Sequence, residues 1–431
     1  MRIGTRIVER AHCVGIGGIG MSALAQYLRD QGVVVTGSDR ERTPVTELLE
    51  RKGISVMVPQ RSDNVPADTD AVIYSDAVPE NNPERVRAAE LDIPQDSYFS
   101  MLGKISAPMR TIAVAGTHGK TTTTGMLAKI LIDAGESPTV IVGSIMKDFG
   151  SNYVAGNSDL FIVEACEYRD HLLELSPEIL VITNLEWDHT DYFPSLEALQ
   201  ESFKKALAKV PEQGAIVTNP THPNIAAILQ STRARIIDYT KEPAYGLQLP
   251  GMFNVENARA AAAAARLVST PITDAAIARS LAAFQGAWRR FEYKGKTKNG
   301  AIVYDDYAHH PTAIKGTLAA LRARTAGKVF VAFHPHLYSR TRDLFEAFSE
   351  SFKDADKVFL APIYAAREKD DGSVSSEILA ERIRAHGVDA VALGSFDALF
   401  AALADAKPGD TIMTMGAGDI YKLADRLVAL T

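Results

Sequence analysis

Cysteine is scarce in this sequence, because its 431 residues include only Cys13 and Cys166. Two cysteines cannot build a disulfide framework, and their spacing suits no metal site. Apolar runs long enough to cross a bilayer are also absent, and residues 1–10 lack the apolar core of a signal peptide. We therefore expect a cytoplasmic protein that contacts no membrane.

The sequence also lacks an excess of positive charge. The 46 Lys and Arg residues are outnumbered by 53 Asp and Glu residues, which gives a formal net charge of −7. No run of five basic residues occurs anywhere in the sequence. Proteins that bind nucleic acids concentrate positive charge, so we expect no nucleic acid partner.

The chain is too long for a single hydrophobic core, and its length favours about three domains. Short apolar runs rich in β-formers alternate with amphipathic segments, the pattern of parallel sheets covered by crossover helices. The stretch 94–106, with its proline and serines, is interpreted as a linker, and a second break falls near Gly286. We therefore predict an α/β fold with domains at residues 1–105, 106–285 and 286–431.

The most informative segment joins a strand predicted at 111–115 to a helix predicted at 123–134. The loop between them contains Gly116, Thr117, His118, Gly119, Lys120, Thr121 and Thr122. Glycines let backbone N–H groups turn toward one anion, and a helix N-terminus adds positive potential. Lys120 can reach the outer phosphates, and the Thr121 hydroxyl can hold Mg²⁺. Although Val114 stands where the usual motif has its first glycine, the segment predicts a nucleoside triphosphate site.

A second glycine-rich turn follows a strand predicted at 11–14, and its glycines are Gly15, Gly17, Gly18 and Gly20. Asp39 ends the next strand, where a dinucleotide-binding fold has its ribose-binding acid. The pattern indicates an NAD site, but such turns also hold other diphosphates, including that of a nucleotide sugar. A structural tight turn is the third interpretation, and the residues alone leave all three open.

Glu164 and His189 follow two strands of the central domain, predicted at 160–164 and 179–183. Open parallel sheets bind ligands at the carboxyl ends of their strands, so both side chains are candidates for the nucleotide site. A carboxylate can hold Mg²⁺ directly or through water, and His189 could bind either a metal or a substrate. The alternative for Glu164 is a solvated charge at the strand end.

Polar side chains also follow two strands predicted in the last domain, at 301–304 and 329–333. They are Asp305, Asp306, His309 and His310 after the first strand, and His334, His336, Arg340 and Arg342 after the second. A guanidinium group pairs with two oxygens of a carboxylate or phosphate, although a solvated helix start is the alternative. Arg289 and Arg290 lie at the preceding domain joint, where an arginine could reach a triphosphate when the domains close.

Taken in order, these segments resemble the Mur ligases across all three predicted domains. The resemblance rests on the glycine turn with Gly-Ser-Asp and on Ala-Gly-Thr-His-Gly-Lys-Thr-Thr-Thr-Thr, Glu-Ala-Cys-Glu-Tyr-Arg, Thr-Asn-Leu-Glu-Trp-Asp-His, Arg-Arg-Phe-Glu, Asp-Asp-Tyr-Ala-His-His-Pro-Thr, His-Pro-His-Leu-Tyr-Ser-Arg-Thr-Arg-Asp-Leu and Gly-Ala-Gly-Asp-Ile. It implies a Rossmann-like N-terminal domain for the UDP of a nucleotide sugar and a central P-loop domain for ATP. A Rossmann-like C-terminal domain would bring the amino acid. The resemblance therefore implies that the first glycine turn binds UDP rather than NAD.

The activity implied by the resemblance is ATP-dependent amide formation between UDP-N-acetylmuramate and L-alanine, through an acyl phosphate in peptidoglycan precursor synthesis. ATP and Mg²⁺ are the implied cofactors, and both a monomer and a homodimer fit. A recycling ligase that adds a ready-made tripeptide to the same nucleotide sugar is the alternative within the family. An NAD-dependent dehydrogenase fused to an ATPase is the alternative from a different class.

Site roles are implied position by position, with Lys120, Glu164, His189, Arg290, Asp306 and His310 as the catalytic set. Lys120 would hold the β- and γ-phosphates, and Mg²⁺ would lie among Thr121, Glu164 and His189. Further nucleotide contacts are implied for residues 116–122, Asn254, Asn257, Arg290 and Asp306. UDP-sugar contacts are implied for Gly15, Gly17, Gly18, Gly20, Ser38, Asp39 and Ser75. His310, Arg340 and Arg342 are the candidates on the side of the amino acid.

Three departures from the family pattern stand out. Phe253 occupies a position where many relatives have histidine, near the implied adenine contacts. Leu337 occupies one often held by arginine, near the implied amino-acid contacts. The path from Tyr239 to Gly251 is several dozen residues shorter than usual, so we predict a shortened central domain that retains its chemistry.

Overall fold

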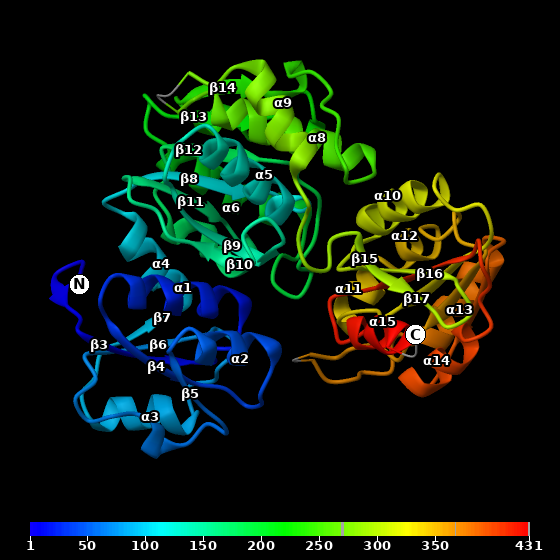
Figure 1. The fold of residues 1–431 in the computed structure, drawn as a ribbon, viewed down its shortest axis with the longest axis horizontal. Helices are drawn as coiled ribbons and strands as arrows, with labels where there is room; N and C mark the ends of the chain where they lie inside the picture. The colour runs from blue at the N-terminus through cyan, green and yellow to red at the C-terminus, as the bar shows by residue number, and fades with distance from the viewer. Residues whose placement is uncertain (269–270, 367, 430–431) are drawn as a thin grey trace. The chain divides into compact units, whose positions relative to one another are not determined.

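The computed structural model describes residues 1–268, 271–366 and 368–429, which form three successive domains with one major sheet each (Figure 1). The predicted α/β architecture with three domains is confirmed. The domains fall into two compact units. One unit contains residues Met1–Leu185, Gln200–Tyr245 and Asn257–Ala283, and the other contains Glu186–Leu199, Gly246–Glu256 and residues 284–429. Within the described ranges, no helix is long and apolar enough to cross a membrane.

The N-terminal domain has a five-stranded parallel sheet in the order β5-β4-β3-β6-β7. Its strands are β3 (Arg10–Val14), β4 (Val34–Ser38), β5 (Ser55–Met57), β6 (Ala71–Tyr74) and β7 (Gln95–Ser97). Its helical segments are α1 (Ile19–Asp30), α2 (Pro44–Arg51), η1 (Ser62–Asn64), α3 (Pro83–Glu90) and α4 (Tyr98–Ser106), and a hairpin of β1 (Arg2–Ile3) and β2 (Arg6–Ile7) precedes them.

The linker predicted at 94–106 is wrong, because this stretch forms β7 and α4. Ser97 caps α4 by accepting a hydrogen bond from the backbone N–H of Ser100 at 3.1 Å. Met101 and Ile105 lie four residues apart on the buried face of the helix. The serine that suggested a loop is therefore a helix start, which is a common position for serine.

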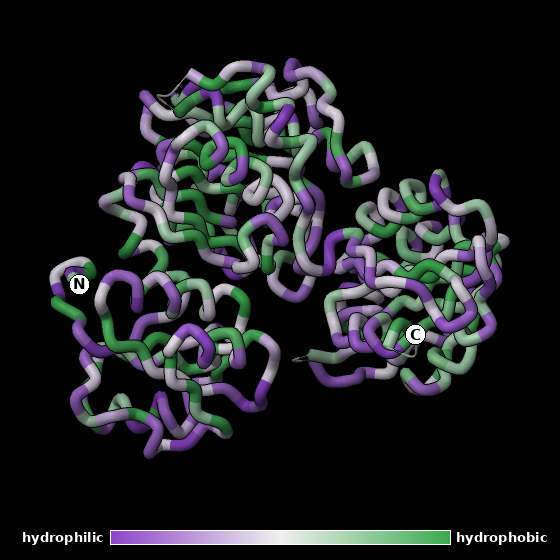
Figure 2. Tube along the Cα trace, viewed as in Figure 1, coloured by the Kyte–Doolittle hydropathy of each residue, from purple (hydrophilic) through white to green (hydrophobic). Residues whose placement is uncertain are grey.

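The central domain has a seven-stranded sheet in the order β10-β9-β11-β8-β12-β13-β14, in which β10 alone is antiparallel to its neighbour. The strands are β8 (Arg110–Ala115), β9 (Thr139–Met146), β10 (Ser151–Val154), β11 (Leu160–Glu164), β12 (Ile179–Ile182), β13 (Ala215–Thr218) and β14 (Arg235–Asp238). The helical segments are α5 (Lys120–Asp133), η2 (Tyr168–Glu174), α6 (Leu196–Lys209), α7 (Pro223–Ala226), η3 (Leu229–Ser231), η4 (Tyr239–Lys241), α8 (Met252–Ala265) and α9 (Asp274–Ala283). Strongly apolar segments run through the strands of this sheet (Figure 2), as expected for a sheet buried on both faces.

Helix α5 begins with a sequence that is poor in helix formers. Thr121, Thr122, Thr123 and Thr124 are all buried in its first turns, and β-branched residues have a low helix propensity. Thr124 donates its hydroxyl to the carbonyl of Lys120 at 2.8 Å. The start of α5 is therefore stabilised by packing against the sheet rather than by its local sequence.

The segment that connects β14 to α8 is short, as predicted. Residues 239–251, all of which the structure describes, contain η4 and no strand. Tyr239 is buried and donates its hydroxyl to the carbonyl of Thr183 at 2.7 Å, just beyond β12. The shortened path therefore remains tied to the central sheet.

The C-terminal domain has a six-stranded sheet in the order β15-β16-β20-β17-β18-β19. The strands are β15 (Glu292–Lys296), β16 (Ile302–Asp306), β17 (Val329–Phe333), β18 (Lys357–Leu360), β19 (Asp389–Ala392) and β20 (Thr411–Met415). The helices are α10 (Pro311–Arg322), α11 (Tyr338–Asp343), α12 (Phe345–Ser349), α13 (Ser376–Ala385), α14 (Phe396–Leu403) and α15 (Tyr421–Val428). β15 is antiparallel to β16 and was not predicted, because Glu-Tyr-Lys-Gly-Lys carries little strand signal.

A buried polar contact joins the N-terminal domain to the central domain within the first unit. Asn152 on β10 donates from Nδ2 to the Ser22 hydroxyl of α1 at 2.9 Å and also to the carbonyl of Ile19. Its Oδ1 accepts from Gln26 Nε2 at 3.1 Å. Asn152, Ser22 and Gln26 are all buried, so this contact fixes α1 on β10 through groups that water does not reach.

We expect Asn152→Ala to lower the free energy of unfolding by about 1–3 kcal/mol, because it leaves buried polar groups of α1 without their partner. The measurement is the first urea transition of the full chain, followed by circular dichroism. Asn157→Ala is the control, since Asn157 is exposed and lies five positions away in sequence. The control should change stability by less than about 0.5 kcal/mol, and equal stability of the two variants would contradict the assigned contact.

His334 lies at the end of β17, beneath the glycine turn that precedes α15. Its ring packs edge-on against Tyr364 and Phe396, with centroids 5.5 and 5.3 Å apart, and the residue is 6% exposed. Burial lowers the pKa of His334 to about 4, against a smaller opposing effect of Asp419. The imidazole is therefore neutral in the folded protein at pH 7.

This burial predicts an acid-sensitive C-terminal domain. The unfolded chain binds the proton near pH 6.5 and the folded chain only near pH 4, so the stability contribution is complete above pH 7 and falls as the pH drops. At pH 5 the loss from His334 is about 2 kcal/mol. The free energy of unfolding, measured with urea, should fall between pH 7.5 and 5 in the wild-type chain. We expect His334→Gln to remove the part of this fall that comes from His334. His386→Gln, at an exposed histidine of the same domain, should keep the full decline.

Candidate active site

The predicted phosphate loop lies between β8 and α5 and is shaped by two glycines with positive φ. Gly116 has φ 126°, and a Cβ there would lie 2.2 Å from Thr183 Oγ1. Gly119 has φ 80° at the N-cap of α5, and a Cβ there would lie 2.1 Å from Asn257 Oδ1 on α8. Both positions therefore require glycine, and Asn257 of the predicted adenine side lies directly against the loop.

The loop is fastened to the end of β12 by Thr183 and Asn184. The backbone N–H of His118 donates to Asn184 Oδ1 at 2.9 Å, and Asn184 Nδ2 donates to the His118 carbonyl at 3.0 Å. The Thr183 hydroxyl donates to the same carbonyl at 2.6 Å. The sequence did not assign these two residues a role, although they open the Thr-Asn-Leu-Glu-Trp-Asp-His segment. They fix the backbone of the loop at His118.

Thr121 and Glu164 meet beside the loop. The Thr121 hydroxyl donates to Glu164 Oε1 at 3.0 Å, and the backbone N–H of Gly143 donates to Oε2 at 2.7 Å. A hydroxyl and a carboxylate are oxygen ligands of the kind that Mg²⁺ prefers. Their proximity fits the predicted magnesium site, with Glu164 already oriented by Gly143.

Lys120 is paired with a carboxylate that the sequence did not single out. Its Nζ lies 2.9 Å from Glu167 Oε1, and it also donates to the carbonyls of Gly116 and Thr117 at 2.5 and 3.3 Å. Burial alone would lower the pKa of Lys120, but Glu167 and neighbouring acidic groups raise it above its ordinary value. Lys120 is therefore a firmly charged ammonium at the phosphate loop. The signal for Glu167 was its place in Glu-Ala-Cys-Glu, three residues after Glu164.

His189 belongs to the second unit and lies in a strained loop. Its φ is 53°, and its backbone N–H donates to Asp188 Oδ1 at 2.7 Å. Asp188 also accepts from Arg340 Nε at 2.7 Å, and both members of this ion pair are buried. Burial alone would raise the pKa of Asp188, but Arg340 and nearby histidines hold it well below its usual range. The role of His189 at a metal stays a prediction.

The arginine pair that opens the C-terminal domain divides into two environments. Arg289 is 4% exposed, pairs with Asp305 at 2.8 Å and donates to the carbonyls of Gly416 and Gly418. Arg290, the predicted nucleotide contact, places its guanidinium carbon 5.1 Å from the centre of the Tyr307 ring. Both guanidinium groups therefore lie near the Tyr307 ring, and Arg289 in addition holds the glycine turn before α15.

Asp306 is buried and receives two backbone hydrogen bonds. The N–H of Phe291 donates to its Oδ2 at 2.6 Å and the N–H of Ala308 to its Oδ1 at 2.7 Å. Burial raises the pKa of Asp306, while Arg290 and these hydrogen bonds oppose the rise. Asp306 thus joins the segment that enters β15 to the segment that leaves β16, at one end of this antiparallel pair, and Arg290 acts on its charge.

The residues predicted on the amino-acid side differ in accessibility. His310 caps α10 by accepting from the Thr312 N–H at Nδ1, so its Nε2 donates to the Trp187 carbonyl at 3.2 Å. Arg340 is 2% exposed and donates to His336 Nδ1 as well as to Asp188. Arg342 is largely exposed and pairs with Asp343 and Asp371. Arg342 therefore faces a surface acid cluster, and the structure does not bring it together with Arg340.

Asn254 and Asn257 both lie on α8, three residues apart and buried. Asn254 Nδ2 donates to the Pro250 carbonyl at 2.7 Å, which fixes the start of the helix. Phe253 packs against Gly316 of α10, where a Cβ would lie 3.2 Å from its ring. Leu337, the other departure, is buried with φ 71° at the start of α11.

The first glycine turn is held from the end of β4. The Ser38 carbonyl accepts from the N–H groups of Gly15 and Ile16 at 2.9 Å each, and Asp39 Oδ2 accepts from the Gly17 N–H at 2.7 Å. Ser38 is fully buried, so it shapes the turn rather than presenting its hydroxyl to a ligand. Ser75 lies directly against the turn, because a Cβ added to Gly15 would lie 3.1 Å from the Cβ of Ser75.

Beneath the turn lies a buried carboxylate, Glu84, which the sequence did not reveal. It accepts from the Ser38 hydroxyl, from Asn64 Nδ2 at 2.6 Å and from the Arg61 N–H at 3.1 Å, and it lies 3.3 Å from His12 Nε2. Burial alone would raise the pKa of Glu84, but these hydrogen bonds lower it. Glu84 therefore anchors the end of β4 and, through it, the turn.

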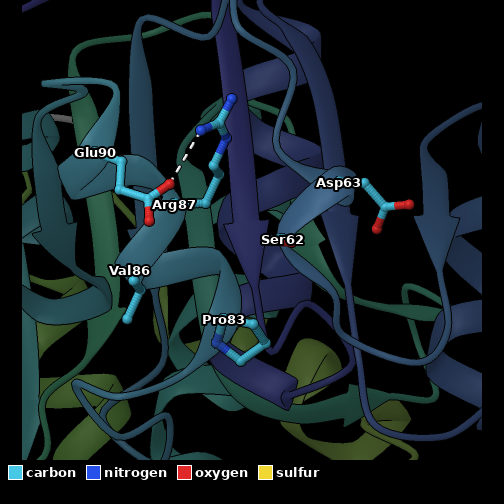
Figure 3. A pocket seen from close by; sticks show the side chains of 6 residues that line it. All are labelled: Ser62, Asp63, Pro83, Val86, Arg87 and Glu90. Atoms are coloured by element: carbon cyan, nitrogen blue, oxygen red, sulfur yellow. Dashed lines mark hydrogen bonds and ion pairs between the residues drawn. The ribbon is translucent and has the colours of Figure 1, made fainter.

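A pocket on the N-terminal domain is formed by residues of η1 and α3 (Figure 3). Its lining residues are Ser62, Asp63, Pro83, Val86, Arg87 and Glu90. Arg87 and Glu90 pair with each other across one turn of α3 at 3.0 Å. None of the predicted site residues lines this pocket.

Comparison with known proteins accounts for all three domains. Residues 10–110 match the Mur ligase family catalytic domain, residues 114–246 the Mur ligase middle domain, and residues 289–418 the Mur ligase glutamate ligase domain.

The relatives extend this match over nearly the full chain. UDP-N-acetylmuramate–L-alanine ligase of Acetivibrio thermocellus is 38% identical, with 97% of this chain and 95% of that protein covered. The protein of the same name from Caldicellulosiruptor bescii is 39% identical, with 96% of each covered. The crystal structure of UDP-N-acetylmuramate-alanine ligase MurC from Thermotoga maritima superposes with a TM-score of 0.79 at 28% identity, covering 97% of this chain and 98% of that one. From its sequence, its three domains and these matches, the chain belongs to the Mur ligase family of ATP-dependent ligases.

Proposed function

We propose that the chain joins L-alanine to UDP-N-acetylmuramate in an ATP-dependent amide-forming reaction of peptidoglycan precursor synthesis. The observation that carries the proposal is the geometry of Lys120, Thr121 and Glu164 around a preformed phosphate loop, in a chain that also has a diphosphate-type glycine turn. The substrates are those in the names of relatives that are 36–39% identical over nearly their full length.

The reaction requires activation, because a carboxylate and an amine do not condense unaided in neutral water. We assign the first step to attack of the muramyl carboxylate on the γ-phosphorus of ATP, which gives an acyl phosphate and ADP. The amine of L-alanine then attacks the acyl carbon, phosphate leaves, and the amine proton is lost. The reaction uses two charged nucleotides, ATP and a UDP-sugar, and we propose that it takes place in the cytoplasm.

In the first step, Lys120 would neutralise the growing charge on the transferred phosphoryl group, as fixed cations do in such reactions. Arg290 would add a second positive charge, with Asp306 supporting the loop beside it. Asn254 and Asn257 are proposed on the adenine side of the nucleotide. Of these residues, Asn257 already touches the loop at Gly119.

Thr121, Glu164 and His189 are the residues proposed to hold Mg²⁺, which would supply positive charge to the phosphate oxygens. Thr121 and Glu164 fit this role because their oxygens are already 3.0 Å apart and Glu164 is oriented by Gly143.

His310, Arg340 and Arg342 are proposed on the amino-acid side. Of these, His310 and Arg340 are buried beside Trp187 and Asp188, whereas Arg342 is exposed. We therefore expect His310 and Arg340 to contribute more than Arg342. The glycines at 15, 17, 18 and 20, with Asp39 and Ser75, are proposed for the UDP moiety, and Ser38 supports them from below.

Replacement of the loop lysine tests the phosphate site. We expect Lys120→Ala to reduce the kcat of amino-acid-dependent phosphate release at least about a thousand-fold, because it removes the charge that stabilises the transferred phosphoryl group. Lys205→Ala, at an exposed lysine of α6, should retain full turnover. Near-normal turnover of Lys120→Ala would contradict the assignment of residues 116–122 as the phosphate site.

The acceptor is tested with the wild-type chain, ATP, Mg²⁺ and UDP-N-acetylmuramate. We expect L-alanine to support phosphate release and a murein tripeptide to give less than about a tenth of that rate, because the two ligases differ in the pocket for the incoming group. Dependence on the tripeptide would assign the chain to the recycling ligases instead. Fluorescence titration with NADH provides a second arm, and saturable NADH binding competed by UDP-sugar would restore the dehydrogenase interpretation.

A further inference from the structure

The ammonium group of Lys120 is fully engaged in the structure. A lysine has three N–H donors, and the three oxygens around Nζ belong to Gly116, Thr117 and Glu167, at 2.5, 3.3 and 2.9 Å. A phosphate that binds Lys120 must therefore displace at least one of these partners.

The three partners are not equally easy to displace. The carbonyls of Gly116 and Thr117 are neutral, and Thr117 makes the longest contact. Glu167 is a carboxylate with 1% of its surface exposed. Separating one member of a buried ion pair strands the other charge, which costs more than losing one hydrogen bond to a neutral carbonyl. A phosphate should therefore replace a carbonyl and leave the Lys120–Glu167 pair intact.

Glu167 is itself held in place by the backbone on either side. The N–H of Ala165 donates to the Val114 carbonyl of β8 at 2.9 Å, and the N–H of Asp170 donates to the Glu167 carbonyl at 3.0 Å. Arg169 and Asp170 both adopt the left-handed conformation, with φ 52° and 61°. Non-glycine residues remain in this region only where their surroundings fix them, and such positions gather at functional sites.

The next residue, His171, fixes this turn to the neighbouring domain. Its ring stacks on Phe99 of α4 with centroids 3.7 Å apart, and its Nε2 lies 3.1 Å from Asp76 Oδ2. Asp76 directly follows Ser75 of the first glycine-turn region. The segment from Glu167 to His171 therefore spans from the phosphate loop to the loop proposed for the nucleotide sugar.

We propose that Glu167 is a positioning residue for Lys120: it stays paired with the ammonium when ATP binds and aims it at the transferred phosphoryl group. The proposal rests on the proposed function, because it takes the partner of Lys120 to be the γ-phosphate of ATP. Alignment matters most in the transition state, where charge is redistributed over the phosphoryl oxygens. Loss of Glu167 should therefore lower kcat more than it weakens substrate binding.

The first test compares Glu167→Gln with Glu178→Gln in the full chain. Glu178 is a surface carboxylate, 42% exposed in its side chain, whose ion pair with Arg110 gives a matched charge change away from the loop. We expect E167Q to lower kcat about 30-fold or more with each KM within about threefold of wild type, and E178Q to keep both within about twofold. E167D retains the charge on a shorter side chain and should recover part of the lost kcat.

The second test is a double-mutant cycle with Lys120→Ala, measured on residual phosphate release. If Glu167 acts only through Lys120, adding E167Q to the Lys120→Ala variant should change kcat less than about twofold. A merely structural role would multiply the two losses. Unfolding midpoints of all variants by circular dichroism check that each one is folded.

Three outcomes would overturn the positioning role while wild-type ligation persists: near-normal kcat in E167Q, multiplied losses in the cycle, or E167D no better than E167Q. A wild-type chain with no amino-acid-dependent turnover would instead overturn the proposed function, and the positioning role would fall with it.

Discussion

The parallel pairing of β8 with β11 on one side and β12 on the other is the constraint on which the proposed nucleotide site depends. In this register Glu164 lies opposite Val114, and Ile182 lies opposite Ala115, so all three strands end at one level. The segments that follow them therefore meet, although they are separated by dozens of residues in sequence. One strand leads into the phosphate loop, the second into the carboxylate proposed for Mg²⁺ and the partner of the lysine, and the third into the side chains that hold the loop.

The same principle operates in the N-terminal domain with a different anchor. There the end of β4 holds the glycine turn through the Ser38 carbonyl, and the buried carboxylate of Glu84 holds Ser38. Burying a carboxylate is costly unless its oxygens are satisfied, and Glu84 meets that condition with several donors. Both glycine turns are thus fixed from the protein side, through hydrogen bonds from their backbone N–H groups to the ends of neighbouring strands.

Much of this arrangement could be predicted from the sequence, because strand ends, glycines and flanking acids are local patterns. The phosphate loop, the strand that ends at Glu164 and the three-domain order all follow from such patterns. What could not be predicted are contacts between segments that are distant in sequence, such as Asn184 on the loop or Glu84 under Ser38. The prediction of a linker around Ser97 was wrong, because serine is common both in loops and at helix N-caps. Arg342 illustrates the remaining difficulty, since a motif does not indicate which of its arginines faces solvent.

The four buried threonines at the start of α5 have a consequence for how the protein is made. A helix start built from β-branched residues has little tendency to form by itself, so it needs the strands beneath it. The third of those strands, β12, ends at Ile182, and the clamp that shapes the loop ends with Asn184. A growing chain that emerges from the ribosome with β8 and α5 alone therefore carries the whole Gly-Lys-Thr motif without a phosphate cradle. The loop, and with it the proposed nucleotide site, takes its shape only after about fifty further residues, up to Asn184, have joined the fold.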